Sequence, residues 1–143
     1  MGYPKNEVQE LFYEYDFAKD GGAVSVISLR PKINPIKEGM IIRGVEVRVK
    51  TALASGGSAT VTLGNTTDAD GYLADFFSLG SLNAVINSGS VAGALLWDDT
   101  NDHPIHYRVD ATAANQDLVL EVGTAALTAG KLEVMLQVSS DGN

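Results

Sequence analysis

Hydrophobic and polar residues alternate along much of this chain, a pattern typical of strands with one buried and one solvated face. In residues 45–50 every odd position is Val and every even position is charged. In residues 131–138 the even positions are aliphatic and the odd positions are mostly polar. Successive side chains of a strand point to opposite faces, and antiparallel sheets commonly bury only one of them. The sequence therefore predicts an all-β fold, an antiparallel β sandwich or a jelly-roll-like barrel.

Further segments with strand character bring the expected total to about seven or eight strands. The segments are 11–17, 23–29, 40–52, 59–63, 105–111, 118–122 and 131–138. A Gly-containing turn at 55–58 joins two alternating runs, which predicts a hairpin between 40–52 and 59–63. A turn at 128–130 is expected to lead into the last strand. Pro31 and Pro35 predict a crossing loop, because proline donates no hydrogen bond to a sheet ladder.

Residues 72–97 interrupt the regular alternation. Leu73, Phe76 and Phe77 are spaced as on a helix, but the glycines of this segment prevent a long one. We therefore predict an irregular, partly helical insertion, with a weak strand near residues 91–96.

The length of 143 residues suits one domain with its own hydrophobic core. We expect an N-terminal arm over residues 1–9, a single β domain over 10–139 and a polar tail over 140–143. Cysteine is absent, which excludes disulfides and thiol chemistry. No apolar run approaches the ~20 residues of a membrane helix, and the N-terminus lacks the apolar core of a signal peptide. These features predict synthesis in the cytoplasm.

The charge balance argues against two classes of partner. Eighteen acidic residues outnumber ten scattered basic ones, giving a formal net charge of −8. Nucleic-acid backbones and anionic membranes both attract clustered Lys and Arg, so we expect neither partner. The excess negative charge favours solubility.

Two acidic segments are candidates for calcium binding. The run Asp68-Ala69-Asp70-Gly71 resembles half of a calcium loop, but no bidentate Glu follows at the expected place. Asp68 and Asp70 are therefore weak candidates, and an ordinary turn is the favoured interpretation. The segment 98–102 holds three carboxylates, and a solvated loop is favoured there too.

No catalytic constellation is present in the sequence. The nucleophile elbow, the phosphate loop and the dinucleotide fingerprint are all missing. His103 and His106 lie three positions apart with Pro104 between them. Residues i and i+3 of a strand point to opposite faces, so we expect a solvated His103 and a sheet-surface His106 rather than a shared metal site. We expect no enzymatic activity, no cofactor and no resident metal.

Four short segments follow one another in a familiar order. They are Met40–Val47 (MIIRGVEV), Gly56–Val61 (GGSATV), Asp68–Leu73 (DADGYL) and Leu127–Val134 (LTAGKLEV). This succession resembles small virion structural proteins of tailed bacteriophages, especially head decoration (cement) proteins. The resemblance implies a β sandwich, jelly roll or β-tulip, often a homotrimer at local three-fold axes. It also implies that the chain lies on the outer surface of the virion and binds the major capsid protein, stabilising the mature shell at capsomer junctions.

Two sets of residues are candidates for these contacts. The aromatic N-terminal region is expected to bind the capsid, by adding a strand to another chain's sheet edge, through Tyr3, Leu11, Phe12 and Tyr13. The apolar part of the insertion is expected to form the oligomer interface, through Leu73, Phe76, Phe77, Leu79 and Leu82. Deleting residues 1–9 should then abolish shell binding without unfolding the domain.

A second interpretation belongs to another class of function. The chain also fits a carbohydrate- or receptor-binding β module of a head fibre or tail, with calcium in the 65–71 or 98–102 loop as an option. Trp97, Tyr107 and Tyr72 are its candidate sugar-stacking residues. Glycan binding that depends on Trp97 or on calcium would favour this alternative.

Overall fold

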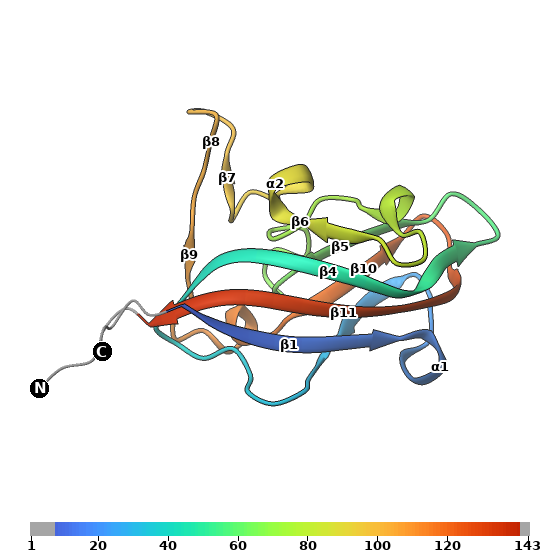
Figure 1. The fold of residues 1–143 in the computed structure, drawn as a ribbon, viewed down its shortest axis with the longest axis horizontal. Coiled ribbons are helices and arrows are strands. Elements are labelled where there is room, and N and C mark those ends of the chain that lie inside the picture. Colours follow the sequence, from blue (N-terminus) through green and yellow to red (C-terminus); the bar gives the residue numbers. More distant parts are fainter. Residues whose placement is uncertain (1–7, 141–143) are drawn as a thin grey trace, which may run out of the picture.

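The alternating segments pair into two antiparallel sheets that pack on each other (Figure 1). This arrangement is seen in the computed structural model of the chain, which describes residues 8–140. The larger sheet has the order β3-β1-β11-β4-β6, and β9 also pairs with β4. Its strands are β1 (Gln9–Asp16), β3 (Arg30–Pro31), β4 (Met40–Ser55), β6 (Val85–Asn87), β9 (Tyr107–Arg108) and β11 (Leu127–Ser140). The smaller sheet has the order β2-β10-β5, with strands β2 (Ser25–Ser28), β10 (Val119–Gly123) and β5 (Thr60–Gly64).

The prediction of an all-β antiparallel sandwich is confirmed. Within residues 8–140 there are eleven strands, of which seven are three residues or longer. The two remaining short strands, β7 (Trp97–Asp98) and β8 (His103–Pro104), form a separate two-stranded ribbon. The helices are single turns: α1 (Phe17–Asp20), α2 (Ser88–Val91) and the 3₁₀ turns η1 (Phe77–Leu79) and η2 (Ala113–Gln116). None of these is long and apolar enough to cross a membrane.

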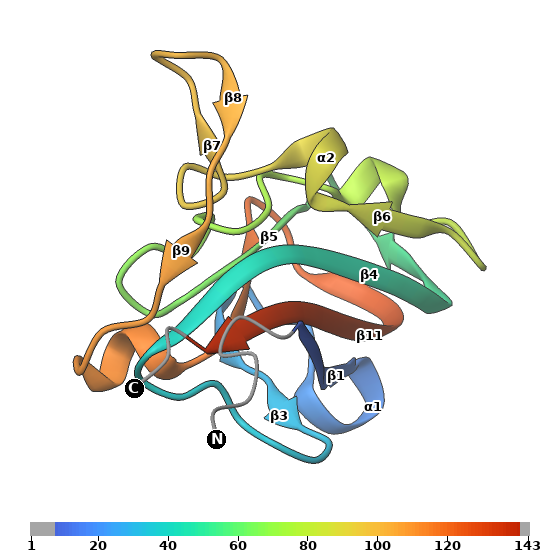
Figure 2. The ribbon, with the colours of Figure 1, turned by 60° about the vertical axis from the view of Figure 1, so that its left-hand side comes forward.

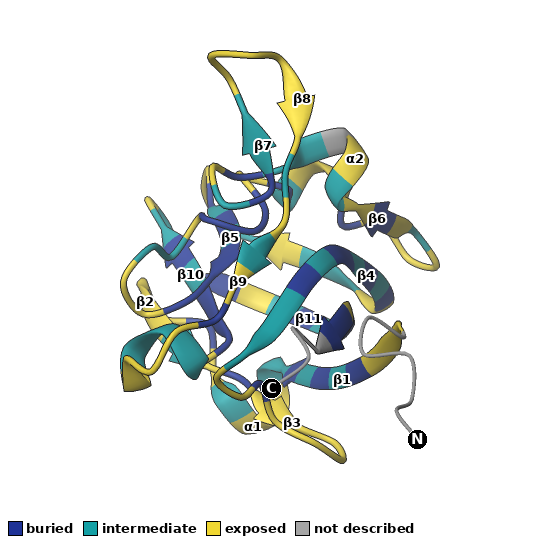
Figure 3. Cartoon of the chain, turned by 90° about the vertical axis from the view of Figure 1, so that its left-hand side faces the viewer, coloured by how far each residue is buried: buried dark blue, intermediate teal, exposed yellow. Residues whose placement is uncertain are grey.

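The hydrophobic core lies between the two sheets and follows the alternation (Figure 3). The larger sheet contributes inward side chains of three adjacent strands, namely Leu11, Tyr13, Tyr15, Val45, Val47, Val49, Leu132, Val134 and Leu136. The smaller sheet contributes Val61, Leu63, Leu120 and Val122. The charged positions between them, such as Glu46 and Arg48, are on the opposite face of the larger sheet.

A β-bulge in β4 explains one departure from strict alternation. Ile42 and Val45 are three residues apart, so a regular strand would place them on opposite faces. Both are buried in the core, because the pairing of β4 with β11 shifts register between Gln137 and Val138. The extra residue on β4 returns Ile42 to the inner face.

The predicted hairpin between 40–52 and 59–63 is wrong. β4 pairs with β11, whereas β5 pairs with β10, so the turn at 56–59 carries the chain from one sheet to the other. Alternation specifies which face of a strand is buried but not which strand lies beside it. The turn expected at 128–130 is also wrong, because β11 already begins at Leu127.

The insertion at 72–97 is irregular and partly helical, as expected, and its helical part consists of two separate turns, η1 and α2. The predicted strand near 91–96 is wrong, since this segment contains the end of α2 and a series of turns. The strand of the insertion is β6, which pairs with β4 and forms an edge of the larger sheet. Beyond the insertion, the β7–β8 ribbon projects from the body of the sandwich (Figures 1 and 2).

Candidate functional site

The predicted capsid-contact residues do not form one exposed surface. Leu11 and Tyr13 are only 3% and 2% exposed, because they lie on the inner face of β1. Because both side chains are buried in the core, they cannot contact another protein, and this part of the prediction is wrong. Phe12 lies on the outer face of β1 and is half-buried. Tyr3 lies outside the described residues.

The inward tyrosines of β1 fix neighbouring loops. The Tyr13 hydroxyl accepts a hydrogen bond from the backbone N–H of Ile36 at 2.8 Å, and the Tyr15 hydroxyl donates to the carbonyl of Gly21 at 2.5 Å. Burial raises the pKa of Tyr13, and burial together with nearby carboxylates raises the pKa of Tyr15 to about 12. These side chains stabilise the fold.

The predicted oligomer interface divides into a buried part and an exposed part. Leu73 and Phe76 are fully buried, so their assignment to a subunit interface is wrong. Leu73 bridges to β5 and to residue 92, which places the start of the insertion inside the core. Phe77 is partly buried. Leu79 and Leu82 are 40% and 59% exposed and remain available for a contact.

A third exposed apolar side chain of the insertion lies on β6. Val85 is 58% exposed and lies opposite Arg48, on the outer face of the larger sheet. We call Leu79, Leu82 and Val85 the insertion patch. The high leucine and phenylalanine content of residues 73–82 predicted an apolar surface here. It did not show which of these residues are buried in the core.

Charges on the outer face of the larger sheet are largely paired. Arg48 contacts Glu46 at 2.8 Å and Glu133 at 3.4 Å, and Lys32 contacts Glu133 at 2.6 Å. The Lys32 ammonium holds the pKa of Glu133 below its usual range. At one end of this face, Arg30 bridges Glu14 and Asp20. Because both signs are interspersed, this face is a solvated surface without a single-sign field.

The calcium candidates lie in a turn held by its own hydrogen bonds. The side chain of Asn65 accepts from the N–H of Asp68 at 2.8 Å, and the N–H of Gly71 donates to the carbonyl of Asp68 at 3.0 Å. Burial raises the pKa of Asp68, and the neighbouring Asp70 adds to this effect. Among residues 8–140, no group of three or more His, Asp or Glu side chains is arranged to hold a metal ion. The geometry fits the favoured interpretation, an ordinary turn.

Tyr72 and Tyr107 do not form an exposed platform for sugars. Tyr72 is fully buried, and its ring meets that of Tyr107 edge to face with centroids 6.1 Å apart. Burial raises the pKa of Tyr72, and the nearby Asn65 side chain offsets part of this rise. The Tyr72 hydroxyl nevertheless makes no hydrogen bond of regular geometry among the described residues. Tyr72 belongs to the hydrophobic core, and Tyr107 is partly buried and packs against it.

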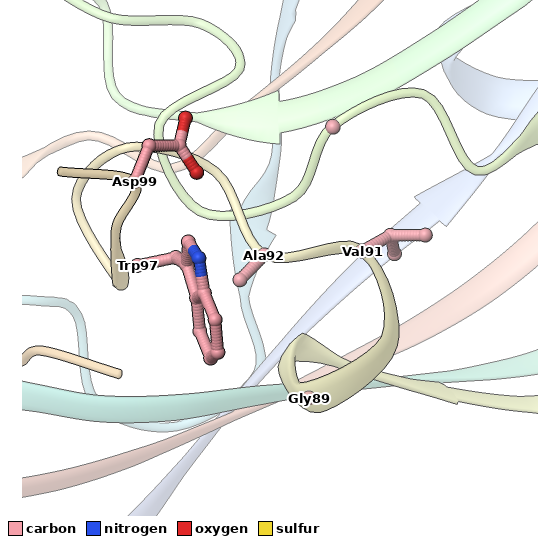
Figure 4. A pocket seen from close by; sticks show the side chains of 6 residues that line it. Gly89, Val91, Ala92, Trp97 and Asp99 are labelled. Carbon is pink, nitrogen blue, oxygen red and sulfur yellow. The ribbon is translucent and has the colours of Figure 1, made fainter. Parts of the chain in front are cut away.

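Trp97, in contrast, lines an open hollow of about 310 Å³ at the base of the β7–β8 ribbon (Figure 4). The other lining residues are Ala74, Gly89, Val91, Ala92 and Asp99. The carboxylate of Asp99 and the indole of Trp97 thus border the same space. Trp97 and Asp99 are neighbours in the sequence, and only the folded chain brings α2 and Ala74 beside them to form the hollow.

Comparisons with known proteins reveal a shared fold. No model of a known protein family matches the chain, and no curated protein sequence matches it significantly. Among solved structures, it is similar to a chain of the cyanophage Pam1 capsid asymmetric unit, with 14% identity, a TM-score of 0.65 and coverage of 98% of this chain and 90% of that one. A chain of the acid-stable capsid of the Helicobacter pylori bacteriophage KHP30 also matches, with 14% identity, a TM-score of 0.47 and coverage of 95% and 90%. The chain therefore has the fold of a protein found in a phage capsid structure, in agreement with the resemblance read from its sequence.

Proposed function

We propose that this chain is a virion structural protein of a tailed bacteriophage, and specifically a decoration protein that binds the mature shell of major capsid protein on its outer surface. The observation that carries the proposal is the likeness to a chain of the cyanophage Pam1 capsid asymmetric unit, which extends over 98% of this chain. The motif order at 40–134 supports it independently. The proposed role involves no catalysis and no cofactor.

The physical mechanism is stabilisation by binding. A protein that binds only the mature shell shifts the equilibrium toward that shell by mass action. When the protein binds across a capsomer junction, its binding free energy opposes the separation of the neighbouring capsomers. The requirements are a rigid body and complementary surfaces, and the sandwich core with its charge-paired outer face supplies the rigid body.

The proposal includes assembly as a homotrimer through the insertion patch. Leu79, Leu82 and Val85 are large apolar side chains that stay exposed in the single chain. Exposed apolar groups of this kind mark protein contacts when they lie together. Buried interface cores are apolar and depleted of charge, which suits the patch better than the charged outer face of the larger sheet.

The test is binding to heads from a phage strain that lacks the gene for this chain. Purified protein is mixed with mature heads and with unexpanded procapsids, and both are sedimented. We expect stoichiometric co-sedimentation with mature heads, little with procapsids, and a higher temperature of head rupture after binding. Absence of binding to mature heads, with the protein folded by circular dichroism, would contradict the decoration role.

A matched pair of variants tests the trimer contact. Leu82→Ser removes an exposed apolar side chain from the patch, and Val26→Ser does the same on β2, where Val26 is 49% exposed. We expect light scattering to show loss of the trimer for Leu82→Ser only. An equal trimer fraction in both variants would remove the patch from the interface.

A further inference from the structure

We propose that the hollow between α2 and the β7–β8 ribbon binds a lysine or arginine side chain of a partner protein. The cation would lie over the indole of Trp97 and beside the carboxylate of Asp99. Neither residue belongs to the surfaces assigned to shell binding or trimer formation above. The inference does not depend on the partner being a shell protein.

The size of the hollow suits a single side chain. Ligand sites usually occupy about 300–1,000 Å³, and this one, at about 310 Å³, is at the lower limit. Figure 4 shows the indole of Trp97 with the methyl group of Ala92 near it and the Asp99 carboxylate at the rim. The aliphatic part of a Lys or Arg side chain would pack on the indole and on the small side chain of Ala92, with its charged end at the carboxylate.

The carboxylate of Asp99 is free to accept such a ligand. The adjacent Asp98 is fully engaged, since it accepts from the N–H groups of Thr100 and Asn101 and from the Asn101 side chain at 2.8 to 3.2 Å. Asp99, within the described residues, takes part in no hydrogen bond or ion pair. The loop thus uses one aspartate to fold and presents the next at the hollow.

The chemistry of the lining favours a cation over a sugar. Asp99 is the one charged side chain of the lining, while Ala74, Gly89, Val91 and Ala92 contribute only main-chain polar groups. An indole face attracts cations through its quadrupole, and a carboxylate beside it adds a charge-assisted hydrogen bond. The net charge of −8 also attracts basic surfaces to the chain at long range.

The chain carries its own reporter for this site, because Trp97 is its single tryptophan. The intact protein is titrated at low ionic strength with a capped Gly-Ser-Arg-Ser-Gly peptide, and the indole fluorescence is followed. The control peptide carries citrulline, a neutral analogue of nearly the same shape, in place of arginine. We expect a saturable change with the arginine peptide and none with the citrulline peptide.

Two variants with the same change of charge locate the binding. Asp99→Asn should raise the dissociation constant for the arginine peptide by about fivefold. This change is equivalent to about 1 kcal/mol of binding free energy, as for an exposed cation site. Asp102→Asn should leave binding unchanged, since Asp102 is at the ribbon tip with a φ of 56°, a conformation that Asn also adopts. Circular dichroism checks that both variants are folded.

The outcomes separate the proposal from its rivals. An equal response to the citrulline peptide, a response that never saturates, or equal affinity in Asp99→Asn and the parent chain would overturn it. A saturable response to disaccharides but not to the arginine peptide would replace the cation site with a sugar site. No phage heads are used, so the result is independent of the decoration experiment.

Discussion

The hydroxyl of Tyr13 accepts a hydrogen bond from the backbone N–H of Ile36 at 2.8 Å, and both groups are buried. This bond ties the central part of β1 to the loop that crosses from β3 to β4. Tyr72 provides the contrast, since it is equally buried but its hydroxyl makes no hydrogen bond of regular geometry among the described residues. The phenol hydroxyl therefore pairs with a backbone N–H of a loop at Tyr13 and lacks such a partner at Tyr72.

The two tyrosines should respond differently to loss of the hydroxyl. Tyr13→Phe leaves the N–H of Ile36 buried and unpaired, which we expect to lower the free energy of unfolding by about 1–3 kcal/mol. Tyr72→Phe removes an unpaired group and should leave that free energy unchanged or raise it. Urea denaturation of both variants at neutral pH measures the difference, and a larger loss for Tyr72→Phe would contradict this account.

The buried phenols also predict a loss of stability in alkali. The pKa of Tyr15 is raised from 10.0 to about 12, and burial raises the pKa of Tyr13 and Tyr72 as well. A raised folded-state pKa means that the unfolded chain releases these protons first as pH rises. The stabilisation is fully present below the unfolded pKa near 10 and, for Tyr15, decreases as pH rises toward about 12.

Tyr72→Phe tests this linkage without removing a hydrogen bond of regular geometry. We expect its free energy of unfolding to decline less steeply with pH above about 10 than that of the parent chain, because one shifted phenol is gone. Denaturant titrations across the alkaline range give the two slopes. Identical slopes would mean that Tyr72 ionises equally in the folded and unfolded chain.

The sequence predicted which face of a strand is buried more accurately than it predicted which strands pair. The alternation at 45–50 and 131–138 identified the buried face of β4 and β11, because the two-residue period of a strand is a local property. It did not identify β10 as the partner of β5, since pairing depends on contacts far apart in the chain. The β-bulge that places both Ile42 and Val45 in the core has the same origin, in the register between β4 and β11.

The candidate surfaces show the same limit. Leu73 and Leu82 are both leucines within one irregular apolar segment, and no period distinguishes them. The fold buries Leu73 against β5 and leaves Leu82 at 59% exposure. Likewise, the hollow at Trp97 requires α2 and the β7–β8 ribbon to lie together, which no local pattern encodes.

A pair of leucine variants measures this division of the insertion. Leu73→Ala should lower the free energy of unfolding by about 2–5 kcal/mol, because it leaves a cavity in a packed core. Leu82→Ala should change it by less than about 0.5 kcal/mol, as is usual for exposed positions. Thermal or urea unfolding checks both values, at a protein concentration at which light scattering shows the parent chain and both variants to be monomeric. Comparable losses in the two variants would mean that Leu82 is also part of the core.

Gly93 allows the close approach of two loops that hold the insertion against the smaller sheet. A Cβ atom at this position would lie 1.9 Å from the carbonyl oxygen of Asp70 and 2.5 Å from the backbone of Gly71. Both obstacles are main-chain atoms, so no side-chain rotation relieves the overlap. The N–H of Gly93 also donates to the carbonyl of Tyr72 at 3.0 Å, which ties the same two segments.

Gly93→Ala should therefore separate residues 70–72 from 93 and lower the free energy of unfolding by about 3 kcal/mol or more. The matched control is Gly56→Ala, because a Cβ at Gly56 meets no atom within 4 Å. That substitution should leave stability within about 0.5 kcal/mol of the parent chain. Denaturant unfolding compares the two alanine variants directly. If Gly93→Ala proved as stable as Gly56→Ala, the close contact between the two loops could not be part of the folded structure.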